Sequence, residues 1–316
     1  YYTDIQAKAV KEIIETTGFD RVFLANSGAE ANEGAIKLAR KYGHQKNEGK
    51  YRIITAVHSF HGRTMMTVTA TGQPNISKDM SHCLQVLIMF LMVIWKRYEK
   101  QWMKMFAVFC SSLFKGKAAF MFPVIHTCMK QDYCAINMTH CLFLMKFKQV
   151  SRVQENGMHS GVKPDIMTFA KGIGGGFPVG GFVVTERLAH VFKPGDHGGT
   201  FGGNALACAA IYATLTTIKN ENILEQTAEK GDYFKKKLEF LMAKYPDKVI
   251  EIRGCGLILG MELAKDGKEV VEACLKRQVI VNCTAGNVIR LVPPLIVTKE
   301  EIDQAVAALD AALAEF

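Results

Sequence analysis

The chain has 316 residues, of which 49% are hydrophobic and 22% are charged, and its formal net charge is +9. This length allows two domains, and the composition is typical of a soluble globular protein. Ten of the 39 basic residues but three of the 30 acidic residues lie within residues 82–156, so most of the net charge belongs to one segment. That segment has no repeat of aromatic and basic residues of the kind that binds single strands. We therefore expect no nucleic-acid partner.

The sequence shows no signal for a membrane or for secretion. Its most apolar run, residues 84–95, is shorter than the roughly 20 residues that span a bilayer. The first residues contain neither an initiator methionine nor a signal-peptide core, so we expect a chain that lacks its original N-terminus. Nine cysteines without a secretory signal are typical of reduced thiols, which predicts a cytoplasmic location.

The first block of the chain alternates helices and strands. We expect a helix at 4–16, a strand at 21–26, a helix at 29–42 and a strand at 51–57, followed by a loop. The run NSGAEANEGAIKLARKY leads from a strand through Ser27, Gly28 and Ala29 into a helix. Unpaired backbone N–H groups and the helix dipole make such a start a candidate phosphate site. An ordinary capped helix is the simpler interpretation of this motif alone.

The next motif, HSFHGRT, follows the end of a predicted strand. Here Phe60 could stack on a flat ring, and Arg63 could bind a carboxylate with two hydrogen bonds. No acidic residue or cysteine has a spacing that would complete a metal site with His58 and His61. We therefore predict two surface histidines and no metal.

Residues 82–156 differ from the rest of the chain. They contain both tryptophans and five of the nine cysteines but one of the 27 glycines. Two histidines and three cysteines within residues 126–141 resemble a loose zinc cluster, although no CxxC pair is present. We expect no zinc there.

Glycine-rich motifs follow this segment. We predict strands at 164–170 and 180–186 and a helix at 204–218. In TFAKGIGGGFPVGG, Lys171 ends a strand and the glycines leave room for a bulky cofactor that a lysine could hold covalently. A structural glycine turn is the alternative, whereas a Walker loop would place its lysine after the glycines. In HGGTFGGN, Thr200 offers a hydroxyl to a phosphate.

The C-terminal part has a different pattern, with shorter strands. We predict a helix at 225–245, strands at 249–254 and 256–263, a helix at 267–277, strands at 279–283 and 288–293, and a final helix from Thr298. That helix opens with the spacing of a capping box. Arg290 lies on a predicted strand, where a lone arginine is usually a surface residue. We expect a large domain at 1–218 and a small domain at 219–316.

Taken together, the motifs NSGAEANE, FHGRT, AKGIGGGFP, GTFGGN, RGCGLILGMEL and NCTAGNVIRLVPPLIV resemble the class III aminotransferases that use pyridoxal 5′-phosphate, and their acetylornithine branch most closely. The resemblance covers residues 1–81 and 159–316. It implies the fold type I architecture, which is an α/β class with a large α/β/α domain, a mixed and mainly parallel sheet, and a smaller α+β domain.

The resemblance also implies how the cofactor is held. Lys171 would bind pyridoxal 5′-phosphate covalently and move a proton during the reaction. The phosphate would lie at Ser27, Gly28 and Ala29, and Phe60 would stack on the pyridine ring. The partner subunit of a homodimer would contribute Thr200.

The same resemblance implies the substrates, an amino donor and 2-oxoglutarate. Arg63 would hold the carboxylate of the donor, and Arg290 the α-carboxylate of 2-oxoglutarate. The family often has serine or threonine where this chain has Gly199, which offers no hydroxyl to the substrate. The implied reaction converts N-acetylornithine and 2-oxoglutarate to N-acetylglutamate 5-semialdehyde and glutamate. Ornithine, succinylornithine and 4-aminobutyrate are the alternative donors.

Two further motifs of the family are not present as written, and both should fall within residues 82–156. One of them carries the aspartate that pairs with the pyridine nitrogen, and Met145 stands in its place. When SSLFKGKAAF (111–120) and FLMKFKQV (143–150) are back-translated and shifted by one nucleotide, they can give EPVQGEGGF and IFDEVQTG, which are the missing motifs. Our hypothesis is that residues 82–156 are a family segment translated out of frame. An inactive, aminotransferase-like chain is therefore the second functional interpretation.

Overall fold

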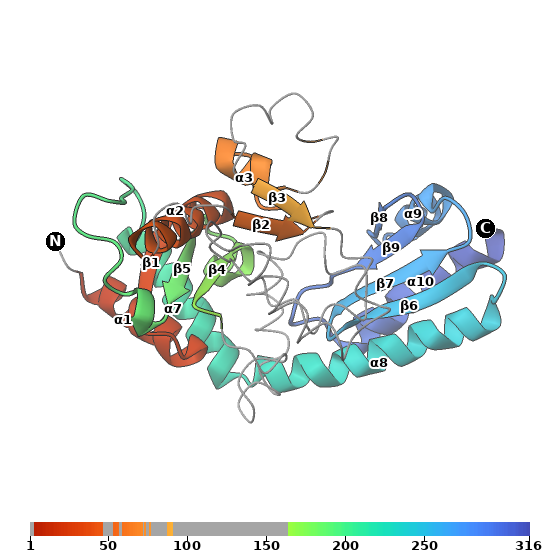
Figure 1. Cartoon of the computed structure of the whole chain (residues 1–316). Coiled ribbons are helices and arrows are strands. Elements are labelled where there is room, and N and C mark those ends of the chain that lie inside the picture. The colour runs from red at the N-terminus through yellow and green to blue at the C-terminus, as the bar shows by residue number, and fades with distance from the viewer. Residues whose placement is uncertain are drawn as a thin grey trace, which may run out of the picture. The chain divides into compact units, whose positions relative to one another are not determined.

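The computed structural model describes residues 3–46, 53–56, 59–71, 73, 76, 87–90 and 164–316. These residues form two compact units, of which the first ends at Thr216 and the second extends from Thr217 to Phe316 (Figure 1). Most of the segment 82–156 lies outside the described residues, including the zinc-like cluster at 126–141, Met145 and both shifted motifs.

The first unit begins with helix α1 (Asp4–Thr17), whose two ends are capped. The Thr3 hydroxyl accepts the Gln6 N–H at 3.3 Å, and Gly18 ends the helix in the left-handed conformation at φ 67°. Ala9 and Ile13 are fully buried on its inner face. The chain then enters strand β1 (Arg21–Ala25).

Three strands of the first unit form one sheet in the order β1-β5-β4, with β4 at Ile166–Ala170 and β5 at Gly180–Val184. Both outer strands run antiparallel to β5. Strands β2 (Ile53–Ala56) and β3 (Leu87–Phe90) form a parallel pair (Figure 1). Among the described strands of this unit, the three-stranded sheet is therefore antiparallel and the separate two-stranded sheet is parallel.

Helix α2 (Gly28–Lys46) packs against β4 and β5. Its inner residues Ala31, Ala35, Ile36 and Leu38 are almost completely buried, which agrees with the amphipathic helix expected at 29–42. Short 3-10 helices at Lys171–Gly174 and Glu186–Leu188 follow β4 and β5, and helix α7 (Ala205–Asn220) follows the second glycine-rich loop.

A short helix, α3 (Met65–Ala70), lies where the sequence predicted only a loop. The Thr64 N–H donates to the Thr67 hydroxyl at 3.0 Å at the start of this helix. Three of the six helical residues are β-branched and therefore poor helix formers, which is why the periodic pattern did not reveal it.

The second unit is an α+β structure with a four-stranded antiparallel sheet in the order β6-β7-β9-β8. Its elements are α8 (Ile223–Lys244), β6 (Val249–Cys255), β7 (Ile258–Leu263), α9 (Lys268–Lys276), β8 (Asn282–Thr284), β9 (Val288–Leu291) and α10 (Lys299–Glu315). One face of the sheet packs its apolar residues into a core with all three helices, centred on Leu238, Met261, Ile289 and Leu309.

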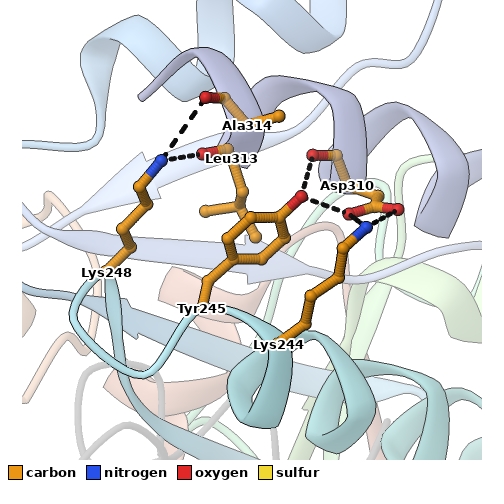
Figure 2. A network of polar contacts seen from close by, with 6 residues as sticks. All are labelled: Lys244, Tyr245, Lys248, Asp310, Leu313 and Ala314. Atoms are coloured by element: carbon orange, nitrogen blue, oxygen red, sulfur yellow. Dashed lines mark hydrogen bonds and ion pairs between the residues drawn. The ribbon is translucent and has the colours of Figure 1, made fainter.

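Helix α10 is fixed at both of its ends. At its start, the Thr298 hydroxyl accepts the Glu301 N–H at 3.1 Å and the Glu301 carboxylate accepts the Thr298 N–H at 2.8 Å, which confirms the predicted capping box. Towards its end, Lys244 and Tyr245 bind the Asp310 carboxylate, and Lys248 donates to the Leu313 carbonyl at 2.6 Å (Figure 2). These contacts tie the end of α8 to α10.

Candidate functional site

The start of α2 has the geometry of an anion site. The Ser27 hydroxyl accepts the Glu30 N–H at 3.2 Å, and the Ser27 carbonyl accepts the Ala31 N–H at 3.0 Å. Gly28 and Ala29 follow in the first turn of the helix, where backbone N–H groups have no carbonyl partner within the helix. The positive end of the helix dipole lies at the same place, so an anionic group would be stabilised here.

The sheet register brings Lys171 to the same edge as this helix start. Ala25, the last residue of β1, pairs with Gly180, and Gly180 also pairs with Ala170, the last residue of β4. Ser27 and Lys171 therefore leave the sheet at one edge, with Gly180 between them. A side chain at this position would clash, because a Cβ on Gly180 would lie 2.5 Å from the Ser27 carbonyl oxygen.

Lys171 has an unusual backbone conformation at this edge. Its φ is 58°, in the left-handed region that costs a residue other than glycine about 1–3 kcal/mol. It opens the 3-10 helix that turns the chain from β4 into the glycine-rich loop, and its side chain is exposed. Backbone strain of this kind persists where the surrounding structure fixes one conformation. Here the surrounding structure fixes the backbone of a lysine beside the anion site.

The HGRT motif packs against the start of α2. Gly62 has φ 140°, and a Cβ there would lie 2.9 Å from the Ala29 Cβ. The Asn32 amide donates to the His61 carbonyl at 2.6 Å and holds the loop in place. Phe60 is half-buried, and the guanidinium of the exposed Arg63 lies 5.7 Å from the centroid of its ring. The structure therefore brings this aromatic–arginine pair to the edge that also holds Lys171.

His61 does not lie at the surface, so that prediction was wrong. It is 4% exposed, and its Nδ1 lies 3.3 Å from the Ser59 hydroxyl. Burial lowers the pKa of its imidazole to about 4, although a backbone hydrogen bond with Ala70 acts in the opposite direction. The ring is therefore neutral at physiological pH. His58 lies outside the described residues.

The loop that carries Thr200 is anchored on β1 at Gly202 and is open at Gly199 and Thr200. A Cβ on Gly202 would lie 2.4 Å from the Leu24 carbonyl oxygen, so the backbone passes directly over the strand. Gly199 and Thr200 are exposed, and no heavy atom would lie within 4 Å of a Cβ on Gly199. Within the described part of the chain, no hydrogen bond joins Thr200 to Lys171 or to any other residue.

His197 anchors the first end of this loop, and we gave it no role from the sequence. Its ring lies 4.6 Å from the Phe23 ring and 5.5 Å from the Phe192 ring, measured between centroids. Its Nδ1 lies 3.4 Å from the Lys37 ammonium. Burial, followed by the Lys37 charge, lowers the pKa of His197, which favours its neutral form. No local signal could reveal these contacts because they involve three distant segments.

Arg290 belongs to the second unit. It lies on β9, is half-buried, and pairs with Gly260 of β7 on one side and Asn282 of β8 on the other. No hydrogen bond or ion pair joins its side chain to another residue that the structure describes. Its guanidinium is therefore available to an anion as far as this unit is concerned.

The described residues contain no group of three or more histidine, cysteine, aspartate or glutamate side chains that could hold a metal ion. Over the same residues, no helix has both the length and the apolar character needed to cross a bilayer.

A model of the family described as aminotransferase class-III matches residues 1–118 and 156–313. The unmatched residues 119–155 lie within the segment 82–156, whereas residues 82–118 lie within the match. Two curated relatives are acetylornithine aminotransferases. The protein of Caldanaerobacter subterraneus subsp. tengcongensis is 42% identical, over 100% of this chain and 81% of the relative. That of Methanothermobacter thermautotrophicus is 40% identical, over 98% of this chain and 78% of the relative.

Solved structures show the same fold. An aminotransferase of Bacillus anthracis is 26% identical and superposes with a TM-score of 0.80, over 100% of this chain and 81% of that chain. The ornithine aminotransferase of Toxoplasma gondii is 24% identical and superposes with a TM-score of 0.81, over 100% of this chain and 77% of that chain. At this identity the second likeness concerns the fold alone.

Proposed function

The chain belongs to the class III aminotransferases, which have the fold type I architecture and use pyridoxal 5′-phosphate, and from this premise we propose that its reaction is the transfer of the terminal amino group of N-acetylornithine to 2-oxoglutarate. The products are N-acetylglutamate 5-semialdehyde and glutamate. The observation that carries the choice of donor is that relatives 39–42% identical over nearly the whole chain are acetylornithine aminotransferases. Ornithine, succinylornithine and 4-aminobutyrate are the competing donors.

The described residues fit the cofactor. The anion site at Ser27, Gly28 and Ala29 holds its phosphate, and Phe60 supplies an aromatic face for its ring. The glycine at position 180 keeps the space between this site and Lys171 free of a side chain. When bound, the cofactor supplies an electron sink that stabilises negative charge at the donor carbon.

Lys171 serves as the covalent attachment point and as the acid–base group. Its ε-amine would take the proton from the carbon that bears the donor's amino group and deliver it to carbon C4′ of the cofactor. The left-handed backbone at this residue supports the role, because it fixes where the side chain leaves the sheet edge.

Arg63 and Arg290 bind the carboxylates of the substrates, Arg63 that of the donor and Arg290 the α-carboxylate of 2-oxoglutarate. A guanidinium offers two parallel N–H groups to a carboxylate, so each arginine fixes the orientation as well as the charge. At Gly199 the loop offers only its backbone, where the family often has a hydroxyl.

The assembly proposed is a homodimer in which Thr200 binds the phosphate of the partner's cofactor. Two observations on the same loop and the following helix support it. Thr200 itself is exposed, and the neighbouring apolar side chains of Phe201 and Leu206 are each 70% exposed, which is costly for a face that stays in water.

The proposed large domain at 1–218 carries Lys171, and the proposed small domain at 219–316 carries Arg290. Four cysteines among the described residues, Cys208, Cys255, Cys274 and Cys283, are free thiols, which supports the proposed cytoplasmic location.

A second candidate function is favoured by Met145, which stands where the family has its ring-nitrogen aspartate. A thioether cannot form that ion pair, so the chain as written would be an inactive relative. Residues 82–156 would then be the out-of-frame translation of a segment that is catalytic in the parent.

The test compares the chain as written with a matched chain whose residues 82–156 are replaced by the in-frame translation. Glutamate formation from 2-oxoglutarate is measured with each of the four donors and added cofactor. We expect the in-frame chain to prefer N-acetylornithine, and the chain as written to be at least about a hundredfold slower. Lys171→Ala in the in-frame chain should lower the rate about a thousandfold or more.

Preference of the in-frame chain for another donor would refute the substrate assignment. Normal turnover by the chain as written would refute the inactive interpretation.

A further inference from the structure

Two arginines share one face of the sheet in the second unit. Arg253 of β6 pairs with Gly260 of β7, and Gly260 pairs in turn with Arg290 of β9. Residues directly opposite each other in an antiparallel sheet project from the same face. The side chains of Arg253 and Arg290 therefore stand on one face with only a glycine between them.

Two glutamates occupy the next row of the same face. Glu251 of β6 pairs with Glu262 of β7, which pairs with Val288 of β9. Glu262 is thus diagonal to both arginines. Diagonal neighbours lie about 7–8 Å apart, within the reach of long side chains, so its carboxylate could pair with either guanidinium.

In the structure, Glu262 pairs with Arg253. Arg253 Nη1 donates to Glu262 Oε2 in a short hydrogen bond and to Glu251 Oε2 at 2.7 Å. The Arg253 side chain is 8% exposed and that of Glu262 is 30% exposed. Because a buried guanidinium without carboxylate partners is strongly destabilised, these bonds are maintained. Arg290 has no such partner among the described residues.

We propose that Arg253 is a positioning residue that holds the Glu262 carboxylate away from Arg290 and so keeps the Arg290 guanidinium available to a substrate carboxylate. The proposal rests on the proposed function, in which Arg290 binds the α-carboxylate of 2-oxoglutarate. Without Arg253, Glu262 turns to Arg290, occupies its paired N–H groups and competes with the substrate. Arg253 thereby acts on affinity for the acceptor through Glu262, without touching the acceptor.

The test measures binding of 2-oxoglutarate to the full chain by calorimetry, with no turnover required. Losing charge-assisted hydrogen bonds to Arg290 should weaken binding about tenfold to a hundredfold in Arg253→Gln. The double variant Arg253→Gln/Glu262→Gln should restore the affinity, because the competing carboxylate is gone. The matched control Arg253→Gln/Glu251→Gln should not restore it, since Glu251 lies two strands from Arg290.

Glu262→Gln alone provides a test that does not depend on the folding of Arg253→Gln. Because Glu262 is already held away, its removal should leave the affinity within about twofold. A gain of about fivefold or more would overturn the proposal, since Glu262 would then be competing in the native protein. An unchanged affinity in a folded Arg253→Gln variant would overturn it too.

Arg290→Gln separates this proposal from the proposed function. If the native chain binds 2-oxoglutarate and Arg290→Gln does not weaken that binding, the role given to Arg290 fails and the positioning role falls with it. If Arg290→Gln weakens binding but Arg253→Gln does not, the positioning role alone is wrong.

Discussion

Burial strongly alters the ionisation of His61. Its backbone N–H donates to the Thr71 hydroxyl at 3.0 Å and its carbonyl accepts from Asn32, so the main chain holds the ring inside the loop that presents Phe60 and Arg63. A buried imidazole without a carboxylate partner is stable in its neutral form. Protonation of His61 at low pH therefore destabilises the folded form of this loop.

The pKa of His61 is about 4 in the folded chain against 6.5 ordinarily, so the unfolded chain binds more protons between these values. The contribution of neutral His61 to the free energy of unfolding is then fully present above pH 6.5 and is lost as the pH drops towards 4. We expect the native chain to lose roughly 2 kcal/mol from this residue between pH 7.5 and pH 5. Urea unfolding at both pH values should show that loss, and His61→Gln should reduce it.

His190→Gln is the matched control. His190 has an 86% exposed side chain and lies 3.4 Å from Glu186, so its removal should leave the acid loss in place. An equal acid loss in His61→Gln and in the native chain would show that His61 is not the group responsible.

At the scale of elements, β5 lies between β1 and β4, and its first residues pack tightly against the backbone of both strands. Gly180 and Gly181 are its first two residues, and a Cβ on Gly181 would lie 2.5 Å from the Phe23 carbonyl oxygen. The strand can begin only with residues that have no side chain. The rest of β5 is apolar and buried, so the strand cannot shift to relieve a clash.

Gly180→Ala should therefore destabilise the fold by about 1–3 kcal/mol or more, because its Cβ meets the Ser27 carbonyl. Gly198→Ala is the matched control, since no atom lies within 4 Å of the added Cβ, and it should be nearly neutral. Thermal unfolding of both variants checks the difference. Equal melting temperatures would mean that the edge is loosely packed.

Local sequence patterns predicted the elements that begin or end with a recognisable motif, such as a capping box or a glycine-rich loop. The capping box of α10 was visible in Thr298 and Glu301, and the glycine-rich loop placed Lys171 at a strand end. The partnership of Arg253 with Glu262 and the burial of His61 were not visible, because they depend on strand register and on contacts with Asn32. Register follows from packing across the sheet, and a single sequence does not display it.

At the scale of the whole molecule, the net charge of +9 is unevenly distributed, because ten basic and three acidic residues lie in 82–156. If that segment is out of frame, the DNA encoding residues 82–158 should contain EPVQGEGGF and IFDEVQTG in the shifted frame. Sequencing this DNA tests the expectation directly. If the codons found do not give both motifs in the shifted frame, the frame hypothesis is wrong.

Helix α10 is the last element along the chain, and it completes the core of the second unit. It buries Leu309, Ala312 and Leu313 with α8, which ends 55 residues before α10 begins (244 to 299). On the ribosome, α8 therefore emerges with its apolar face uncovered and waits for α10 before the core can close. A frame error that arose after α8 and was not corrected before α10 would leave that face exposed to aggregation, whereas an earlier error corrected before α8 would spare this unit.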